Sequence, residues 1–253
     1  MQLNFIDLGS GPRTALLLHG MSGSAESWGA VIDSLVDVGY RVLALDLPGH
    51  GRSFRDAESS VWAASDAVVD TVRANVPGPL TVAIGHSYGG SVLAAAADRL
   101  RPTTPVYVDA GMFIQGGQDR GTLIAQYEQD RQLRSQRDWL RNSRPYYDDR
   151  AIDAEVRAAE NFDPVTMAAV SVGDDFSWEP APGSIVVRAD PSAWITDVSA
   201  AQLVRRGVHV RNVPGAAHTV WYSHYNDFVH ALPEVFSESN RRKIQTMRTS
   251  DRG

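Results

Sequence analysis

Short apolar runs rich in Val, Leu and Ile recur along the chain, and segments with helical spacing separate them. Most of the runs are apolar at both alternating positions, which is typical of strands that helices cover on both faces of a sheet. The runs that predict such strands lie at residues 14–19, 40–46, 80–85, 105–109, 184–189 and 207–213.

Helical periodicity fills the intervals between these runs. Residues 24–38 place Trp28, Val31 and Ile32 on one face, and the segments 61–76 and 88–100 follow with similar spacing. The regular alternation of strand and helix predicts an α/β fold, with a mostly parallel sheet and flanking helices.

The alternation stops between residues 112 and 182, where polar segments with helical spacing replace the apolar runs. Glycine and proline at 116–117 and 180–183 provide turn chemistry at both ends of this stretch. We expect a helical cap inserted into a core formed by residues 1–111 and 183–236. A polar and flexible tail is expected over 237–253.

Five arginines recur in this insertion at steps of three and four residues, which would place them on one helix face. A solvated face is the simpler interpretation, and recognition of an acidic substrate or partner is the alternative. The arginines are Arg131, Arg134, Arg137, Arg141 and Arg144.

Composition narrows the functional classes. The 253 residues are 43% hydrophobic and 21% charged, which suits one sizeable core carrying an insertion. The net charge of −6 argues against nucleic acid as a partner. The absence of cysteine excludes disulfides, a cysteine nucleophile and iron–sulfur sites.

No apolar run approaches the roughly 18 residues of a membrane span and no basic leader opens the chain. We therefore expect a soluble, cytoplasmic protein with no membrane partner.

The strongest chemical signal is GHSYGG at residues 85–90, directly after one predicted strand and directly before a predicted helix. A nucleophilic serine must stand exposed on a very tight turn, and glycine two residues to either side relieves the crowding there. Ser87 is therefore the predicted nucleophile. The helix that follows points its N-terminus at the site, so the Tyr88 N–H is a candidate oxyanion donor.

A second turn, HGMSGS at residues 19–24, also follows a predicted strand. Glycine at position 20 allows the backbone to bend so that the next N–H, that of Met21, can face Ser87. Met21 and Tyr88 together predict an oxyanion hole with two backbone donors.

Between these signals lies DLPGHGRS at residues 46–53. The order and spacing of the three motifs resemble the α/β-hydrolase superfamily, and in particular its small, cap-bearing esterases, lactonases and C–C hydrolases. The resemblance covers about the first hundred and the last seventy residues. It implies that Asp46 and His50 are chiefly scaffold.

The base is expected at His218. The segment VPGAAH at residues 213–218 follows the last predicted strand, where a loop can bring the imidazole over the nucleophile. The order Ser…Asp…His is that of this fold. His86 adjoins Ser87, but neighbours on so tight a turn point apart. The histidine spacing gives no metal motif, and we expect neither a metal nor a cofactor.

The acid that orients His218 has two candidates. The resemblance favours Asp190, which follows the predicted strand 184–189, although many relatives carry Gly-x-x-Asp where this chain has RAD. Asp109, at the end of the preceding strand, is the competitor, because some family members take the acid from that position. A carboxylate in either place would hold the imidazole tautomer and stabilise the imidazolium.

Aromatic and sulfur-bearing side chains are the candidate substrate contacts, although each could equally fill the core. Together they predict a hydrophobic acyl or alcohol group in the substrate. The candidates are Trp28, Met112, Phe113, Trp139, Trp178, Trp194 and Trp221.

The sequence thus predicts a serine hydrolase that cleaves a carboxylic ester, lactone or thioester of a small hydrophobic molecule through an acyl-enzyme. The same residues could serve a C–C-bond hydrolase or an acyltransferase. A ligand-binding receptor that kept the fold without turnover is the alternative from another class.

Overall fold

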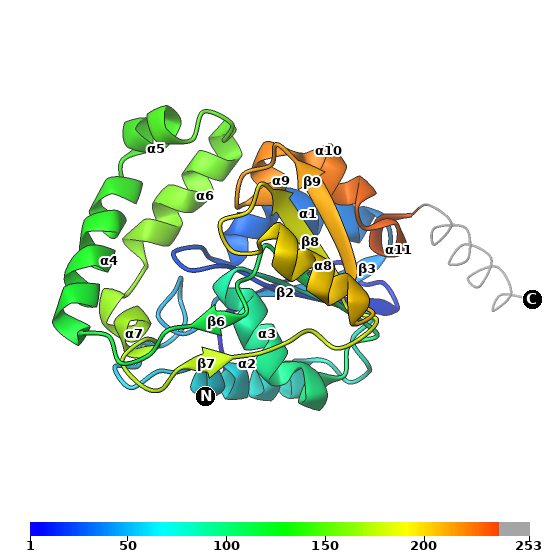
Figure 1. Cartoon of the computed structure of the whole chain (residues 1–253), viewed down its shortest axis with the longest axis horizontal. Helices are drawn as coiled ribbons and strands as arrows, with labels where there is room; N and C mark the ends of the chain where they lie inside the picture. Colours follow the sequence, from blue (N-terminus) through cyan, green and yellow to red (C-terminus); the bar gives the residue numbers. More distant parts are fainter. Residues whose placement is uncertain (238–253) are drawn as a thin grey trace, which may run out of the picture.

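The computed structural model describes residues 1–237 of the chain, and its centre is one seven-stranded sheet in the order β1-β3-β2-β4-β5-β8-β9 (Figure 1). All neighbouring strands are parallel except β1, which pairs with β3 in the antiparallel sense. The strands are β1 (Phe5–Leu8), β2 (Arg13–Leu18), β3 (Tyr40–Leu45), β4 (Val82–His86), β5 (Thr104–Val108), β8 (Ile185–Asp190) and β9 (His209–Pro214). The predicted α/β class and the six predicted strands are confirmed. The short edge strand β1, partly exposed along its length, was not predicted.

Alternating strand residues divide the core into two layers, one on each face of the sheet. Leu16 and Leu18 of β2 belong to the layer under α2, α3 and α8, whereas Ala15 and Leu17 face α1 and the C-terminal helices. All four are fully buried, as the apolar runs predict. The helices of the two layers are η1 (Ala25–Trp28), α1 (Gly29–Asp37), α2 (Val61–Asn75), α3 (Tyr88–Leu100), α8 (Asp197–Arg205), α9 (Val220–Ser223), α10 (Tyr225–His230) and α11 (Pro233–Phe236).

The stretch between β5 and β8 is the insertion. It holds a small two-stranded antiparallel sheet and four helices, of which α4, α5 and α6 stand beside the main sheet in Figure 1. Its elements are β6 (Phe113–Ile114), α4 (Arg120–Arg134), α5 (Arg137–Ser143), α6 (Asp149–Glu160), α7 (Pro164–Ala169) and β7 (Phe176–Ser177).

One expectation for the insertion was wrong, and one feature was not predicted. The missed feature is the antiparallel pair of β6 and β7, because two-residue strands leave no alternating pattern. The five arginines do not share one helix face, because the chain turns at Ser135 and Gln136 between α4 and α5. The tail predicted from residue 237 falls, from residue 238 onward, outside the described residues. Within the described part, no helix combines the length and the apolarity needed to cross a membrane.

Buried polar side chains fix the loops that follow β2 and β3. The Asp46 carboxylate accepts hydrogen bonds from the Ala25 N–H (2.8 Å) and the Arg52 N–H (3.1 Å). His19 Nε2 accepts from the Leu47 N–H at 3.0 Å, and His50 Nε2 accepts from the Ser22 N–H at 3.3 Å. Asp46 and His50 thus bind backbone groups, in keeping with the scaffold role expected from the resemblance.

These buried histidines should make stability depend on pH. Burial lowers the pKa of His19, His50 and His86 below the ordinary value, so below about pH 6.5 the unfolded chain binds more protons than the folded one. The free energy of unfolding should therefore fall as the pH falls through this range. We expect Tm to drop by at least about 2–4 °C between about pH 7.5 and about pH 5.5, the shift that about 1 kcal/mol produces in a domain of this size.

The control compares the slope of Tm against pH in two variants. His50→Gln removes one buried imidazole and should flatten the dependence of Tm on pH, whereas His209→Gln, on an exposed position, should leave the slope unchanged. A wild-type Tm that is constant over this range would contradict the assignment.

Candidate active site

Ser87 occupies the turn between β4 and α3, in a backbone conformation that few side chains adopt. Its φ is 49° and its ψ is −119°. Such a conformation is strained, and it persists only where the surroundings hold it in place. Here the Ser87 N–H donates to the Val108 carbonyl at 3.0 Å, and the Ser87 carbonyl accepts from the Gly90 N–H at 2.9 Å. The turn thus holds Ser87 at the carboxyl end of β4.

The glycines of this turn are required by close backbone approach. A Cβ on Gly89 would lie well inside van der Waals contact of the Leu18 and His19 carbonyl oxygens, and a Cβ on Gly85 would lie 2.5 Å from the Gly89 carbonyl oxygen. These are backbone atoms that cannot swing aside. Helix α3 can therefore reach β2, with Ser87 at its N-terminus, only because both positions lack a side chain.

The loop after β2 passes directly beside this turn. A Cβ on Gly20 would lie 2.7 Å from His86 Nδ1 and 3.1 Å from the Ser87 Cβ. Met21 follows and, with Ser87, lines the same two cavities. Tyr88 is the first residue of α3, where an N–H has no acceptor within the helix. Both predicted oxyanion donors thus belong to backbone that adjoins Ser87.

The structure brings His218 together with Asp109. The His218 Nδ1 lies 2.7 Å from Asp109 Oδ2, and the Asp109 side chain is 1% exposed. The other carboxylate oxygen accepts the Ala189 N–H at 3.2 Å. Asp109 itself has a φ of 43°, directly after β5, so its side chain turns away from the strand direction and towards β8. His218 Nδ1 therefore carries the proton, which leaves Nε2 free to accept one.

The structure does not place Asp190, the preferred candidate acid, against His218. Asp190 is the last residue of β8, and its side chain is 37% exposed and lies 3.7 Å from the Arg188 guanidinium. Its backbone carbonyl accepts the Gly215 N–H at 2.8 Å, so β8 is still paired with β9 at this residue. The carboxylate faces Arg188 and solvent, while the position against His218 is already filled by Asp109.

His86 contacts the loop that carries His218, the predicted base. Its Nε2 lies 3.1 Å from the His218 carbonyl oxygen, and the two rings are 4.6 Å apart. Burial, followed by the neighbouring His218, holds the pKa of His86 well below its ordinary value. A neutral His86 can donate from Nε2 to that carbonyl, which helps to hold the loop that carries the base.

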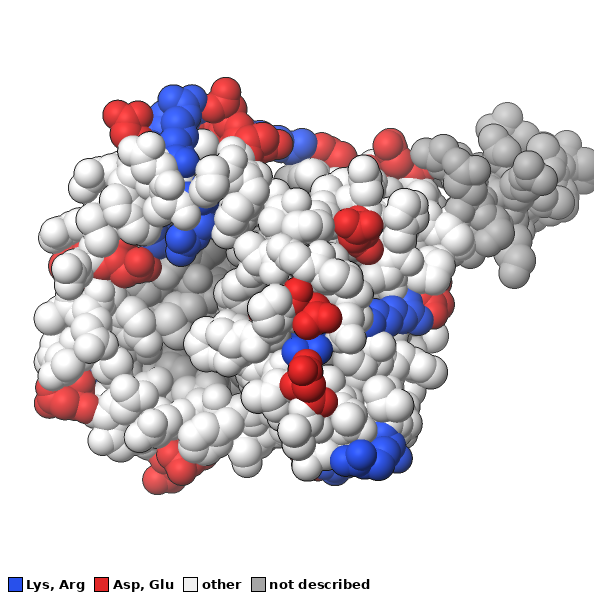
Figure 2. All heavy atoms as spheres, turned by 45° about the horizontal axis from the view of Figure 1, so that its top comes forward, with Lys and Arg blue, Asp and Glu red and all other residues white. Residues whose placement is uncertain are grey.

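Ser87 lies between two cavities of different chemistry. The first, which we call the polar cavity, has a volume of about 170 Å³ and is lined by His218, by Trp221 and by polar side chains of the insertion. The second, the apolar cavity, has a volume of about 360 Å³ and contains Phe113, Val170 and Trp194. Figure 2 shows the molecule hollowed between the inserted helices and the core, with basic atoms at the upper rim.

Three of the seven predicted substrate contacts line one or other of these two cavities. Trp221 lines the polar cavity, and Phe113 and Trp194, each 57% exposed, line the apolar one. The Trp194 ring is also 5.5 Å from the His218 ring. The remaining four candidates do not line either cavity: Trp28 stacks on Trp221 at 4.0 Å, Trp178 packs on Tyr107 at 4.7 Å, Met112 packs on the core, and Trp139 is half-buried on α5.

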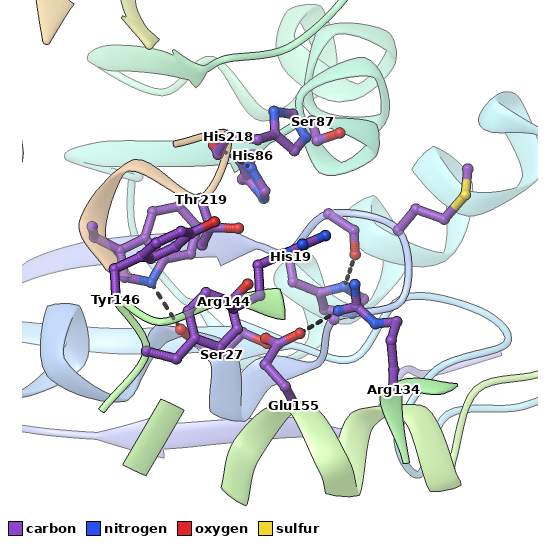
Figure 3. A pocket seen from close by; sticks show the side chains of 15 residues that line it. His19, Ser27, His86, Ser87, Arg134, Arg144, Tyr146, Glu155, His218 and Thr219 are labelled. Atoms are coloured by element: carbon purple, nitrogen blue, oxygen red, sulfur yellow. Dashed lines mark hydrogen bonds and ion pairs between the residues drawn. The ribbon is translucent and has the colours of Figure 1, made fainter. Parts of the chain in front are cut away.

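A buried charge cluster closes the polar cavity opposite Ser87 (Figure 3). Glu155 of α6 pairs with Arg134 of α4, and its other oxygen accepts the Ser27 hydroxyl at 3.0 Å and the Tyr222 hydroxyl at 3.1 Å. Arg144 reaches the same cavity from the end of α5. Sequence reasoning did not identify Glu155, and it interpreted the arginines mainly as a solvated face.

No group of three or more His, Asp or Glu side chains within residues 1–237 is arranged to hold a metal ion. The polar side chains around Ser87 are instead engaged with one another, as described above.

A family model described as the alpha/beta hydrolase family matches residues 15–232, which run from within β2 to beyond β9. This chain belongs to the alpha/beta hydrolase family. The resemblance seen in the three sequence motifs is thereby confirmed.

Curated proteins match parts of this hydrolase-family chain. Over 97 residues, 38% of the chain, it is 33% identical to a dihydrolipoyllysine-residue acetyltransferase component of the acetoin cleaving system of Cupriavidus necator. Over 56 residues, 21% of the chain, it is 45% identical to a 2-hydroxy-6-oxononadienedioate/2-hydroxy-6-oxononatrienedioate hydrolase of Escherichia coli (strain K12 / DH10B). The matched stretches span 26% and 19% of the lengths of those two proteins.

Solved structures resemble this family member over nearly its whole length. An esterase from Exiguobacterium antarcticum superposes with a TM-score of 0.71 at 14% identity, covering 92% of this chain and 94% of its own. An E-2-(acetamidomethylene)succinate hydrolase superposes with a TM-score of 0.70 at 20% identity, with the same coverage of 92% and 94%. At these identities the likeness establishes the fold.

The crowding at the nucleophile turn predicts the effect of a single methyl group. Gly89→Ala should push α3 away from β2 and lower the free energy of unfolding by about 1–3 kcal/mol or more. Gly78→Ala is the matched control, because a Cβ there would meet no atom within 4 Å. Thermal unfolding followed by circular dichroism measures both variants, and equal Tm values for the two would contradict the close approach of backbone at Gly89.

Proposed function

We propose that this chain is a serine hydrolase that cleaves a carboxylic ester, lactone or thioester through an acyl-enzyme. The observation that carries the proposal is the 2.7 Å contact of His218 with the buried Asp109, at a cavity that His218 shares with the strained Ser87. Ser87 is the nucleophile, His218 the base and Asp109 the acid. Asp109 takes the role that was first expected of Asp190.

The first half of the reaction forms the acyl-enzyme. The Ser87 hydroxyl oxygen attacks the carbonyl carbon while His218 Nε2 takes the hydroxyl proton. Asp109 stabilises the imidazolium that results, and the Met21 and Tyr88 N–H groups donate to the oxyanion, each contributing about 3–4 kcal/mol. When the tetrahedral intermediate collapses, the bond to the leaving group breaks and that group takes the proton from His218.

The second half releases the acid. Water enters the polar cavity, His218 removes its proton, and the resulting hydroxide attacks the acyl carbon. Collapse of the second intermediate returns the proton to Ser87 Oγ and frees the carboxylic acid. No redox step occurs, so these residues complete the cycle without a further reactant.

The insertion takes the part of a cap in this proposal. Its α4, α5 and α6 segments supply Arg134, Arg144 and Glu155 to the polar cavity, and its strand β6 supplies Phe113 to the apolar one. A cap of this kind selects the substrate and limits the access of water to the acyl-enzyme.

Cleavage of a carbon–carbon bond is the second candidate. The 45% identical stretch in the Escherichia coli dioate hydrolase favours it, and the acetyltransferase component likewise makes acyl transfer a variant of the same chemistry. These reactions differ from ester hydrolysis in the group expelled and in the acceptor, while Ser87, His218 and the oxyanion donors serve all three.

The nucleophile is tested with a fluorophosphonate probe. Wild-type protein should be labelled and should hydrolyse 4-nitrophenyl butanoate, and Ser87→Ala should lose both activities while keeping the wild-type Tm. Ser91→Ala, on the next turn of α3, is the matched control and should be labelled. A folded wild type that the probe does not label would favour the receptor interpretation.

The acid is tested by exchanging each carboxylate for an amide. Asp109→Asn should lower kcat by about 10⁴-fold, because the amide cannot hold the imidazole in the tautomer that leaves Nε2 unprotonated. Asp190→Asn should change kcat by less than about threefold, since substitutions at exposed positions outside the site cost about 0.5 kcal/mol or less. Steady-state kinetics with 4-nitrophenyl butanoate gives both values, and the reverse ranking would return the role to Asp190.

A further inference from the structure

The two cavities beside Ser87 determine the orientation in which the substrate binds, provided that the proposed function holds. The leaving group must collect its proton from His218, and His218 lines the polar cavity. The apolar cavity instead contains Ser87 and Tyr88 together with Phe113 and Trp194. The leaving group therefore departs into the polar cavity, and the acyl group occupies the apolar one.

The arginines of the insertion differ in one decisive respect. Among the described residues, four of the five arginines that were predicted to share one helix face have a carboxylate within 4.0 Å, whereas Arg144 has none. The pairs are Arg131 with Glu128, Arg134 with Glu155, Arg137 with Asp149 and Asp153, and Arg141 with Asp149. An anionic group of a ligand bound in the polar cavity is the partner that remains for the Arg144 guanidinium.

The Arg144 guanidinium has more N–H donors than its hydrogen bond within the protein uses. One nitrogen donates to the Ser143 carbonyl at 3.0 Å, and the half-buried side chain lines the polar cavity between α5 and α6. A guanidinium carries five N–H donors in a planar fork that matches a carboxylate. In a partly desolvated cavity this attraction exceeds that of an arginine on an open surface.

The neighbours of Arg144 leave its charge available. The Glu155 carboxylate is already satisfied by Arg134, Ser27 and Tyr222. Tyr147 also lines the cavity, and burial raises its pKa, so its phenol is neutral near pH 7 and does not compete for the guanidinium. Figure 3 places Arg144 between this cap cluster and the side of the cavity that holds His218.

We propose that the substrate is an ester or thioester of an apolar acid with a leaving group that bears a carboxylate, and that Arg144 binds this carboxylate. Arg144 is a specificity residue for the proposed reaction, because it contacts the departing part of the substrate and not the scissile carbonyl. The acyl group meets the aromatic surface of Phe113 and Trp194.

The experiment compares matched esters that differ only in one charge. 4-(Butanoyloxy)benzoate carries a carboxylate on the leaving group, and methyl 4-(butanoyloxy)benzoate is its neutral counterpart. Phenyl hydrogen glutarate and phenyl pentanoate form the second pair, with the carboxylate on the acyl side. The ratio of kcat/KM within each pair, compared between proteins, cancels the intrinsic reactivity of the esters.

For the first pair, Arg144→Met should lower the ratio of charged to neutral ester by about tenfold or more, the loss expected for one charge-assisted contact. The loss in kcat/KM should be larger for the charged ester than for the neutral one, and Arg144→Lys should keep part of the preference. Arg141→Met is the matched control: it removes a positive charge from the same helix, but one paired with Asp149, and should preserve the ratio. An unchanged ratio in Arg144→Met overturns the proposal, and so does a loss confined to the acyl-side pair.

A binding measurement separates this proposal from the proposed function. Ser87→Ala should bind 4-(butanoyloxy)benzoate about tenfold or more tightly than Ser87→Ala/Arg144→Met, as followed by tryptophan fluorescence. Equal affinities overturn the role of Arg144 whether or not any ester is hydrolysed. Arg144-dependent binding in a protein whose wild type hydrolyses no ester would instead support the anion site and refute the hydrolase.

Discussion

The parallel sheet imposes the constraint on which the candidate site depends. Parallel strands bring their carboxyl ends to one edge, and Met21, Ser87 and Asp109 follow β2, β4 and β5 at that edge. The last contact comes from the far end of the sequence, where the loop after β9 carries His218 back to Asp109. Met21, Ser87 and Asp109 thus follow strands that are largely buried, and they have little freedom to move relative to one another.

Much of this arrangement could be predicted from local sequence. The strand, the glycines and the helix around Ser87 lie within residues 82–100, so their pattern is complete in the sequence itself. His218 could likewise be placed, because a loop after the last strand reaches the same edge. The order of the motifs also sufficed to place the chain in its family.

The choice between the two candidate acids for His218 could not be made from local sequence. Asp109 and Asp190 each end a strand at the correct edge, and the choice depends on a backbone φ of 43° at Asp109 and on the pairing of Asp190 with Arg188. Neither feature can be recognised from the spacing of residues along the sequence. The arginines of the insertion posed the same difficulty, because the partner of Arg134 is 21 residues away, on another helix, and only tertiary packing reveals which guanidinium is left unpaired.

The hydrogen bonds of Glu155 have a mechanical consequence. This carboxylate, on α6, binds Ser27 in η1 and Tyr222 in α9, so it fastens the insertion to the core in addition to the two chain connections at β5 and β8. Arg150 and Arg157 of the same helix pair with Asp33 and Glu26 of the core. Swinging α6 outward would break all of these contacts, of which the two hydrogen bonds to Glu155 contribute about 1.5–3 kcal/mol each. The insertion is therefore held to the core along α6 and does not move as a lid on a single hinge.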